Sequence, residues 1–408
     1  MTVSVLARTR ARQWPLATAA AVCILSFIAF WVAQRLAHVN MLDVMVYRAE
    51  GETVRAGGDL YAMRATSANL AMTYPPFAGL LFVPLTFVGV PLMRTLATAG
   101  NLLLVVALVQ LTLQLVRPSL SGARLWRAAL LVAAVVVWCE PVWTTLRYGQ
   151  INLLIAVAVL WDFTRREGNR WAGVGIGLAT AVKLTPGLFV VFLLVAGVLQ
   201  WRRERRWNQW LRTAATATGV FLGTTLASAL VLPYDSRRFW TETLFETGRV
   251  GFAEETANQS LRGVLARLMH TDDPGLWWLV VAVLFGGAAM ALAVRSALRG
   301  DKALAVVVCA ITALMVSPIS WSHHWVWCVP LLVLLVDRRD RVRPRWAAGA
   351  VALVFASFAL WWVPHDPGRP ELDQNAGQML LSAVYPLTMT VLFAGYALAR
   401  RRQAVAKE

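Results

Sequence analysis

Residues 15–47 decide the fold: the apolar run PLATAAAVCILSFIAFWVA (15–33) is followed, after a short polar link, by MLDVMVY (41–47). An apolar stretch of about 20 residues is long enough to cross a bilayer as a helix. Arg8, Arg10 and Arg12 precede the run, as basic residues do in a signal peptide, but no small-residue cleavage site follows Ala33. We therefore expect an uncleaved first membrane helix with MLDVMVY at its outer mouth.

Apolar stretches of this kind recur up to residue 398, and the 408-residue chain is 58% hydrophobic. Soluble domains are nearer 45–50% apolar. We therefore expect an all-α integral membrane protein that forms one transmembrane domain over residues 1–408. The four cysteines have no spacing typical of disulfides or zinc, so we expect them to serve in packing.

About 12 membrane spans are expected. Several are shorter than a full crossing needs, which is plausible where helices are broken inside a bundle. The stretch from Pro75 to Pro84 is interpreted as a half-helix that enters from the outer face, since Pro is tolerated in a first helical turn. The expected spans are residues 15–34, 91–115, 128–144, 150–162, 171–182, 186–200, 210–232, 276–294, 303–317, 325–336, 346–363 and 379–398.

The distribution of charge gives the orientation. With that half-helix, most of the 39 Lys and Arg residues lie on the side of the N-terminus, in clusters such as Arg202–Arg206, Arg338–Arg345 and Arg400–Arg402. Basic loops stay in the cytoplasm, so both termini are expected there. The net charge of +17 is thereby explained by topology rather than by nucleic-acid binding.

The residues that a lipid-facing scaffold does not need gather on the expected outer face. They lie in a first outer loop (35–90), in a second one (234–275) and in short turns between spans. This asymmetry places the chemistry on the non-cytoplasmic side. Aromatic residues among them are candidates for packing on sugars, although they would serve equally as anchors at the membrane interface. The candidate substrate-binding residues are Tyr47, Arg48, Tyr61, Arg64, Tyr74, Gln150, Asn152, Asn258, Gln259 and Trp321.

Asp43 is the candidate catalytic residue. A carboxylate is costly to keep among Met41, Leu42 and Val44, and an apolar setting would raise its pKa toward the range that suits a general base. The alternative is a solvated first-turn acid of an amphipathic helix. Glu50 and Glu52 flank a glycine in polar surroundings, and we expect both at the surface.

Four cationic or imidazole side chains are candidates for binding a phosphate: Lys183, Arg262, His323 and His324. Lys183 lies between two short apolar halves, where it would either clamp an anion or extend to the interface. Adjacent helical residues point about 100° apart, so only one of the two histidines would face a cavity. A metal site is not expected.

Taken in order, these motifs resemble glycosyltransferase family 87, and within it the enzymes that act on phosphatidylinositol mannosides. The resemblance spans residues 40–330 or so and rests on stretches such as DVMVY (43–47), TYPPFA (73–78), GQINL (149–153), KLTP (183–186), NQSL (258–261) and SPISW (317–321). It implies a GT-C fold with a partly helical first periplasmic loop. It also implies an inverting, polyprenol-phosphate-mannose-dependent α-(1→2)-mannosyltransferase, with Asp43 as general base.

The resulting hypothesis is transfer of mannose from polyprenyl-phosphate-mannose to the 2-hydroxyl of a mannose on a phosphatidylinositol mannoside, without a metal or other cofactor. Related GT-C families often have an acidic pair in the first loop, whereas Asp43 is expected to act alone. Branching or capping of lipomannan and lipoarabinomannan is the alternative within the class. A lipid-linked sugar transporter or flippase is the alternative from another class.

Overall fold

The computed structural model describes residues 15–338, 346–365 and 368–405. Arg8, Arg10 and Arg12, together with most of the Arg338–Arg345 cluster, lie outside these ranges. The described part is mostly helical, and its strands are β1 (Arg64–Ala65) and β2 (Leu70–Ala71), which pair antiparallel. The expectation of an all-α protein therefore holds apart from one small hairpin.

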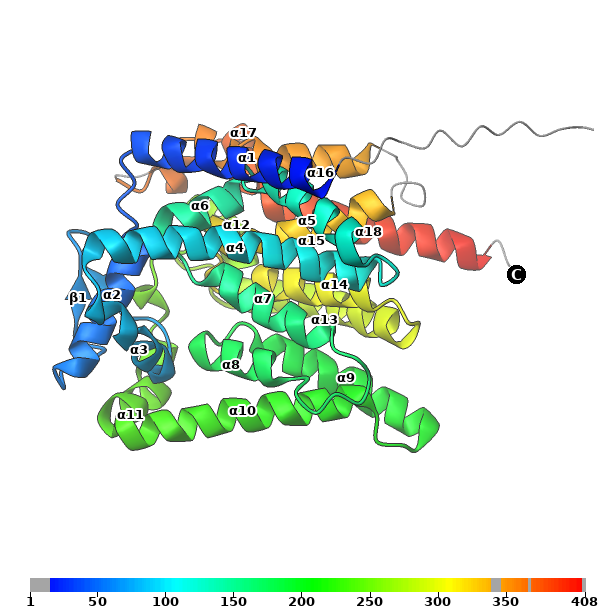
Figure 1. Ribbon diagram of the computed structural model, residues 1–408, viewed down its shortest axis with the longest axis horizontal. Coiled ribbons are helices and arrows are strands. Elements are labelled where there is room, and N and C mark those ends of the chain that lie inside the picture. Colours follow the sequence, from blue (N-terminus) through cyan, green and yellow to red (C-terminus); the bar gives the residue numbers. More distant parts are fainter. Residues whose placement is uncertain (1–14, 339–345, 366–367, 406–408) are drawn as a thin grey trace, which may run out of the picture.

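Four described helices are long and apolar enough to cross a membrane: α1 (Leu16–Leu36), α4 (Val90–Val116), α10 (Gln209–Val231) and α13 (Gly275–Leu298). They match the expected spans 15–34, 91–115, 210–232 and 276–294. Figure 1 shows α1, α4 and α10 running roughly along the long axis of the molecule. On α1, Ile24 and Leu25 are 57% and 65% exposed. A helix that exposes apolar side chains in this way is stable when lipid covers them.

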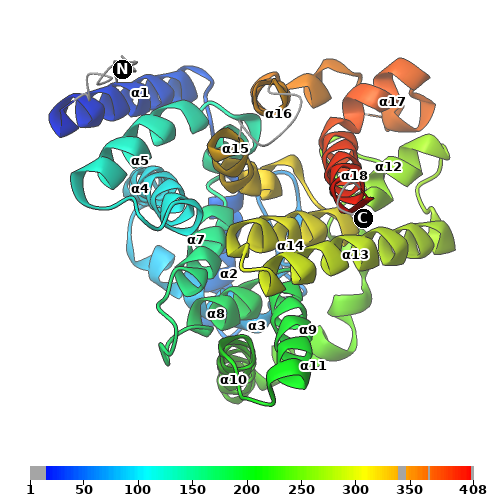
Figure 2. The ribbon, with the colours of Figure 1, turned by 90° about the vertical axis from the view of Figure 1, so that its right-hand side faces the viewer.

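Shorter apolar helices fill the interior of the bundle. Almost every residue of α14 is buried, and α13, α9, α15 and α4 pack around it, as Figure 2 shows for the first three. Apart from α9, which has 18 residues, these helices are too short to cross a bilayer by length alone, so the structure by itself does not establish twelve crossings. Their bounds are α7 (Asn152–Phe163), α8 (Val174–Val182), α9 (Gly187–Glu204), α14 (Lys302–Val316), α15 (Cys328–Asp337) and α16 (Ala347–Ala356).

Two expected spans, 128–144 and 379–398, are wrong as straight helices. The first is divided into α5 (Gly122–Val136) and α6 (Glu140–Tyr148), which are bent by 80°. The second is divided into α17 (Ala376–Ser382) and α18 (Val384–Val405), bent by 76° over Val384–Ala399. A proline in the first turn of the second helix explains both breaks, because Pro141 and Pro386 cannot continue a preceding helix. Counting each bent pair as one span raises the membrane-capable set among the described residues to six.

Short elements cover one end of the bundle, where Figure 1 shows α2, β1, α3 and α11 together. The half-helix expected from Pro75 is present as α3, which begins at Pro76 and is followed by a 3-10 turn. The bounds of the short elements are α2 (Leu42–Arg55), α3 (Pro76–Phe82), η1 (Val83–Phe87), α11 (Pro233–Thr241), η2 (Thr243–Phe245), η3 (Thr247–Arg249), α12 (Leu261–Leu268), η4 (Ser322–Trp327), η5 (Ala359–Trp362) and η6 (Pro370–Asp373).

Candidate active site

Helix α2 positions Asp43. The helix begins at Leu42 after the left-handed Met41 (φ +53°), so Asp43 lies in its first turn, where the helix dipole stabilises a negative charge. Gly51 allows the close packing of α2 on η1, because a Cβ atom there would lie 2.6 Å from the carbonyl oxygen of Phe82. Asp43 is half-buried. Burial raises the pKa of its carboxyl to about 6, while a hydrogen bond from Gln150 and the charge of Lys183 oppose the rise.

A chain of polar contacts leads away from Asp43. The Tyr47 hydroxyl donates to Gln150 Oε1 at 2.9 Å and lies 3.2 Å from the Tyr74 hydroxyl. Asn152 Nδ2 donates to the same oxygen at 3.4 Å, and Asn152 Oδ1 accepts from Lys183 Nζ at 3.3 Å. These five residues come from four segments of the sequence, and the structure brings all of them together.

The chain ends at a pair of nitrogens, since Lys183 Nζ lies 2.9 Å from His324 Nε2. Burial, followed by the charge of Lys183, lowers the pKa of His324 well below its usual value, so the ring is neutral. Nε2 then accepts from the ammonium, and the ring proton is on Nδ1. Burial lowers the pKa of Lys183 to about 7, opposed by the charge of Asp43.

A pocket opens beside this pair, and Lys183, His324 and Asn152 line it. Its other walls are largely apolar and come from α7, α9 and α14. Two donors at the edge of an apolar pocket are suited to hold an anionic group that carries a hydrocarbon tail. We call the pocket and these three polar residues the phosphate site.

His324, rather than its neighbour, lines the phosphate site. The carbonyl oxygen of His323 accepts from Thr145 Oγ1 at 2.7 Å and from Asn152 Nδ2 at 3.1 Å. The ring of His323 packs edge-on against Tyr148, with the centroids 5.5 Å apart. His323 therefore fixes the η4 turn against α6, and this turn aims His324 at the pocket.

Arg262 does not join the phosphate site. Its guanidinium lies 3.6 Å from Asp273 and 5.6 Å from the centroid of the Trp278 ring. Among the described residues, no hydrogen bond or ion pair connects it to Lys183 or His324. The contacts of Arg262 hold α12 to the start of α13.

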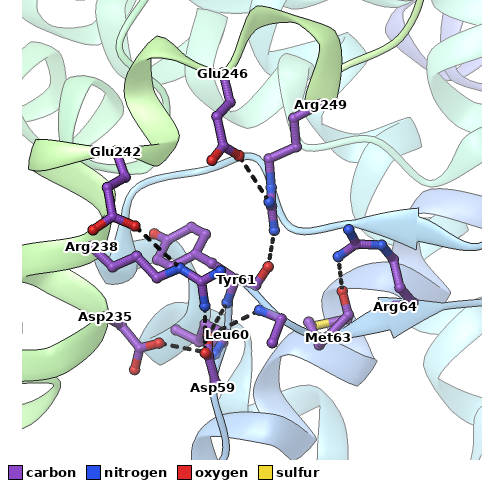
Figure 3. Close-up of polar contacts among 11 residues, drawn as sticks. Asp59, Leu60, Tyr61, Met63, Arg64, Asp235, Arg238, Glu242, Glu246 and Arg249 are labelled. Atoms are coloured by element: carbon purple, nitrogen blue, oxygen red, sulfur yellow. Dashed lines mark hydrogen bonds and ion pairs between the residues drawn. The ribbon is translucent and has the colours of Figure 1, made fainter.

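Tyr61 lies where the two outer loops contact each other, as Figure 3 shows. Arg249 of the second loop donates to the carbonyl oxygen of Tyr61, and Arg238 pairs with Asp59. The Tyr61 hydroxyl donates to the carbonyl oxygen of Tyr74 at 2.9 Å, which connects these loop contacts to the site. Arg64 is exposed and donates to the carbonyl oxygen of Met63 within its own loop.

Arg48, Asn258, Gln259 and Trp321 are occupied by contacts within the protein. Arg48 donates to the carbonyl oxygens of Leu85 and Val88 at 2.7 and 2.6 Å. Asn258 and Gln259 are fully buried: Asn258 accepts from the Ser320 N–H just before η4, and Gln259 donates to the carbonyl oxygen of Ser382 at the α17–α18 break. Trp321 covers Gly251, whose Cβ position lies 2.7 Å from the ring. These four residues build the walls around the site.

Glu50 was expected at the surface, and this expectation is wrong. It is 1% exposed, and one turn separates it from Tyr47 on the face of α2 that carries Asp43. Burial and, second, the nearby Asp43 raise the pKa of its carboxyl well above the usual value. Asp43 therefore does not stand alone: the first loop holds two buried or half-buried carboxyl groups on one helix. Asp43 and Glu50 are seven residues, or two helical turns, apart in the sequence, and this spacing indicates that they share one face of a helix.

Glu140 is a second buried carboxyl that sequence reasoning missed. Its Oε1 accepts from Thr144, Ser322 and the Trp361 indole at 2.7, 2.8 and 3.0 Å. Its Oε2 accepts from the Tyr385 hydroxyl at 2.7 Å. Four donors from α6, η4, η5 and α18 thus converge on one carboxyl group, which holds the η4 turn in place. The residue was hidden within an expected apolar span, although Glu140-Pro141 is a helix-start signal.

Replacing Glu140 with Ala should destabilise the protein by roughly 2–4 kcal/mol, because four buried donors lose their acceptor. Glu140→Gln keeps one acceptor oxygen and should lose less. Thermal unfolding of the purified protein measures both, with Glu242→Ala, a 64% exposed carboxylate, as control. An Ala variant as stable as the Glu242 control would contradict the role of Glu140 as the anchor of η4.

The pH dependence of kcat/KM should be bell-shaped with a maximum between about 6 and 7. Below the Asp43 pKa of about 6 the carboxyl is protonated and cannot accept a proton, and above the Lys183 pKa of about 7 the ammonium loses its charge. Lys183→Arg should remove the alkaline limb, because guanidinium stays charged. A variant profile that keeps this limb would show that another group titrates there.

The family comparison assigns residues 72–318 to "Glycosyltransferase family 87". A relative from Mycolicibacterium smegmatis, named polyprenol-phosphate-mannose-dependent alpha-(1-2)-phosphatidylinositol mannoside mannosyltransferase, is 36% identical over 359 residues. The alignment covers 82% of this chain and 78% of that relative. A relative of the same name from Mycobacterium tuberculosis is 33% identical over 345 residues, which are 80% and 76% of the two chains.

Among solved structures, the chain is similar to that of ArnT from Cupriavidus metallidurans bound to undecaprenyl phosphate, with a TM-score of 0.46 and 15% identity. That similarity covers 93% of this chain and 76% of ArnT, and a score this low does not establish a shared fold. The family match and the two relatives confirm the resemblance expected from the motifs. The chain belongs to glycosyltransferase family 87.

Proposed function

We propose that this glycosyltransferase moves mannose from polyprenyl-phosphate-mannose to the 2-hydroxyl of a mannose on a phosphatidylinositol mannoside. One observation carries the proposal: Asp43 and the Lys183–His324 pair lie at the two ends of one hydrogen-bonded chain beside a pocket. Glycosyl transfer from a lipid phosphate needs a base and a cationic anion site, and here Gln150 and Asn152 connect the two. The names of the mycobacterial relatives supply the donor, the acceptor and the linkage.

The reaction inverts the anomeric centre. The acceptor 2-hydroxyl loses its proton to Asp43, and its oxygen forms a bond with C1 of mannose on the face opposite the phosphate. The bond between C1 and the phosphate oxygen breaks, and the electron pair stays on the departing polyprenyl phosphate. Lys183 and His324 stabilise the growing charge there, as preorganised donors do at a transition state. A β-linked donor thereby gives an α-mannoside.

Four polar residues lie between the two ends and are assigned to the sugars: Tyr47, Tyr74, Gln150 and Asn152. Tyr74 contributes an aromatic ring as well, which lies 5.6 Å from the Lys183 ammonium. Arg48, Tyr61, Arg64, Asn258, Gln259 and Trp321 support this arrangement through their contacts with the protein. The role of Arg262 in donor binding stays a prediction from sequence.

The proposed membrane arrangement is a single GT-C domain over residues 1–408, with about twelve crossings, both termini in the cytoplasm and the active site at the periplasmic face. Two features support it. The elements of the first outer loop gather at one end of the bundle in Figure 1. Arg202 and Arg203 lie in the last turn of α9, at the end away from Lys183, where cytoplasmic charge is expected.

The proposal is tested by supplying purified protein with radiolabelled polyprenyl-phosphate-mannose and a phosphatidylinositol mannoside in detergent. Because no compartments exist there, product measures chemistry and not transport. We expect a lipid product with one added mannose in α-(1→2) linkage. If no mannose were transferred but the donor crossed the membrane of proteoliposomes, the protein would be a transporter and not an enzyme.

Removal of divalent metals should leave the rate within about twofold of its starting value, because the Lys183 ammonium and the N–H donor of the neutral His324 ring stabilise the leaving phosphate. Among the described residues there is no group of three His, Cys, Asp or Glu side chains placed to hold a metal ion. The rate of transfer is measured in EDTA and in EDTA plus excess Mg²⁺ or Mn²⁺. If the rate fell in EDTA and either metal restored it, the metal ion would have a role in catalysis.

A further inference from the structure

A second pocket lies between α1, α4 and α6, at the outer ends of the first two. It shares no lining residue with the phosphate site. Its apolar walls include Phe30, Trp31 and Val39, and Trp31 of α1 is 41% exposed. The exposed apolar surface of α1 therefore continues into the wall of the pocket.

Two arginines line this pocket, Arg35 from the last turn of α1 and Arg94 from the first turns of α4. Neither has a carboxylate partner among the ion pairs of the described residues. The Arg35 guanidinium lies 5.0 Å from the centroid of the Trp31 ring. Arg94 Nε is buried without a hydrogen-bond partner in the described structure. Two unpaired guanidinium groups in one pocket attract an anion, and their forked donors match phosphate.

Gln34 supplies a third polar group. The residue is 7% exposed and lines the pocket, and its Oε1 atom has no hydrogen-bond partner in the described part of the chain. Its Nε2 atom is occupied at 3.5 Å by the carbonyl oxygen of Trp143. Buried polar atoms in folded proteins nearly always have partners, so an unpaired acceptor in a pocket points to a ligand that donates. A hydroxyl group beside the phosphate would satisfy it.

The pocket is lined by two residues that lie close in sequence to the site. These are Met41, two residues before Asp43, and Leu146 of α6. Thr145, the neighbour of Leu146, binds His323 on the other side of α6. Helix α6 therefore separates the two pockets. An inverting transfer requires acceptor and leaving group on opposite faces of the donor sugar, so a lipid held here is the acceptor.

We propose that Arg35, Arg94 and Gln34 form a subsite for the phosphodiester head group of the acceptor lipid. The arginines bind the phosphodiester, and the Gln34 carboxamide oxygen accepts from a hydroxyl of the ring next to it. The acyl chains extend along the exposed face of α1 into the bilayer. This inference rests on the proposed function. It adds a way for the enzyme to distinguish a phospholipid acceptor from a free mannoside.

The test compares two acceptors in nanodiscs: a phosphatidylinositol dimannoside and an alkyl α-mannoside that lacks phosphate. Arg35→Ala, Arg94→Ala and the double variant should raise KM for the phosphoinositide about 10- to 100-fold, the loss expected for charge-assisted hydrogen bonds. KM for the alkyl mannoside and for the donor should stay unchanged. Gln34→Glu, which adds a repelling carboxylate, should act in the same direction. Arg237→Ala, an exposed arginine of α11, is the matched control.

Turnover of the alkyl mannoside also shows that each variant is folded. Should the double variant not fold, Arg35→Ala still tests the proposal, because it alters only an exposed side chain. An equal rise of KM for both acceptors, a rise confined to the donor, or no rise at all would overturn the subsite. A wild-type enzyme that transfers mannose to neither acceptor would instead reject the proposed function itself. The two failures are therefore distinguishable.

Discussion

Replacing Asp43 with Asn should lower kcat by about 10²–10⁴-fold, the contribution usual for general base catalysis. The substitution removes the proton acceptor but keeps the shape of the side chain and its place in the first turn of α2. Its partner Gln150 can turn to hydrogen-bond the amide. We therefore expect KM for polyprenyl-phosphate-mannose and the unfolding temperature to change little.

Glu52→Gln is the matched control for Asp43→Asn. Glu52 is on the same helix, its side chain is 53% exposed, and it pairs with Arg48 at the surface. An exposed pair of this kind contributes little, so the control should keep nearly full activity. If Asp43→Asn turned over as fast as Glu52→Gln, the base would have to be sought elsewhere, and Glu50 would be the next candidate.

Replacing Lys183 with Gln should lower kcat/KM by about 10²–10³-fold, because the leaving phosphate loses the cation that faces it. The effect should be larger on kcat than on donor KM, since charge on the phosphate grows toward the transition state. His324→Gln should act in the same direction. The double variant should lose less than the product of the two, because the groups are 2.9 Å apart and act as a unit.

Lys302→Gln is the control for Lys183→Gln. Lys302 is at the start of α14, outside the phosphate site. Steady-state rates at several donor concentrations, with acceptor saturating, separate kcat from KM. Equal losses in the Lys183 and Lys302 variants would mean that the change at position 183 acts through stability rather than through the phosphate.

The sequence was sufficient where local patterning determines structure. Long apolar runs predicted α1, α4, α10 and α13, and Pro76 in a first-turn position predicted the start of α3. The interrupted run around Lys183 predicted a break, and the structure places that lysine between α8 and α9. Polar residues at one end of successive spans were expected to meet, and Tyr47, Gln150, Asn152 and Lys183 do so.

Features that depend on tertiary packing were not predictable in this way. The seven-residue spacing places Glu50 on the same face of a helix as Asp43, but its burial follows from the close approach of α2 and η1 at Gly51, a tertiary contact. Glu140 is stabilised by Ser322, Trp361 and Tyr385, residues about 180–245 positions further along the chain. Arg262 was grouped with the phosphate ligands by its charge alone, whereas its contacts are with α13.

A structure of the Asp43→Asn variant with donor and acceptor bound would be the most direct measurement. We expect the donor phosphate between Lys183 and His324, and the acceptor 2-hydroxyl roughly 2.6–3.2 Å from the side chain at position 43, the reach of a general base. A complex with the phosphate away from both of these residues, or with the reacting hydroxyl beyond reach of position 43, would contradict Asp43 as the base of this transferase.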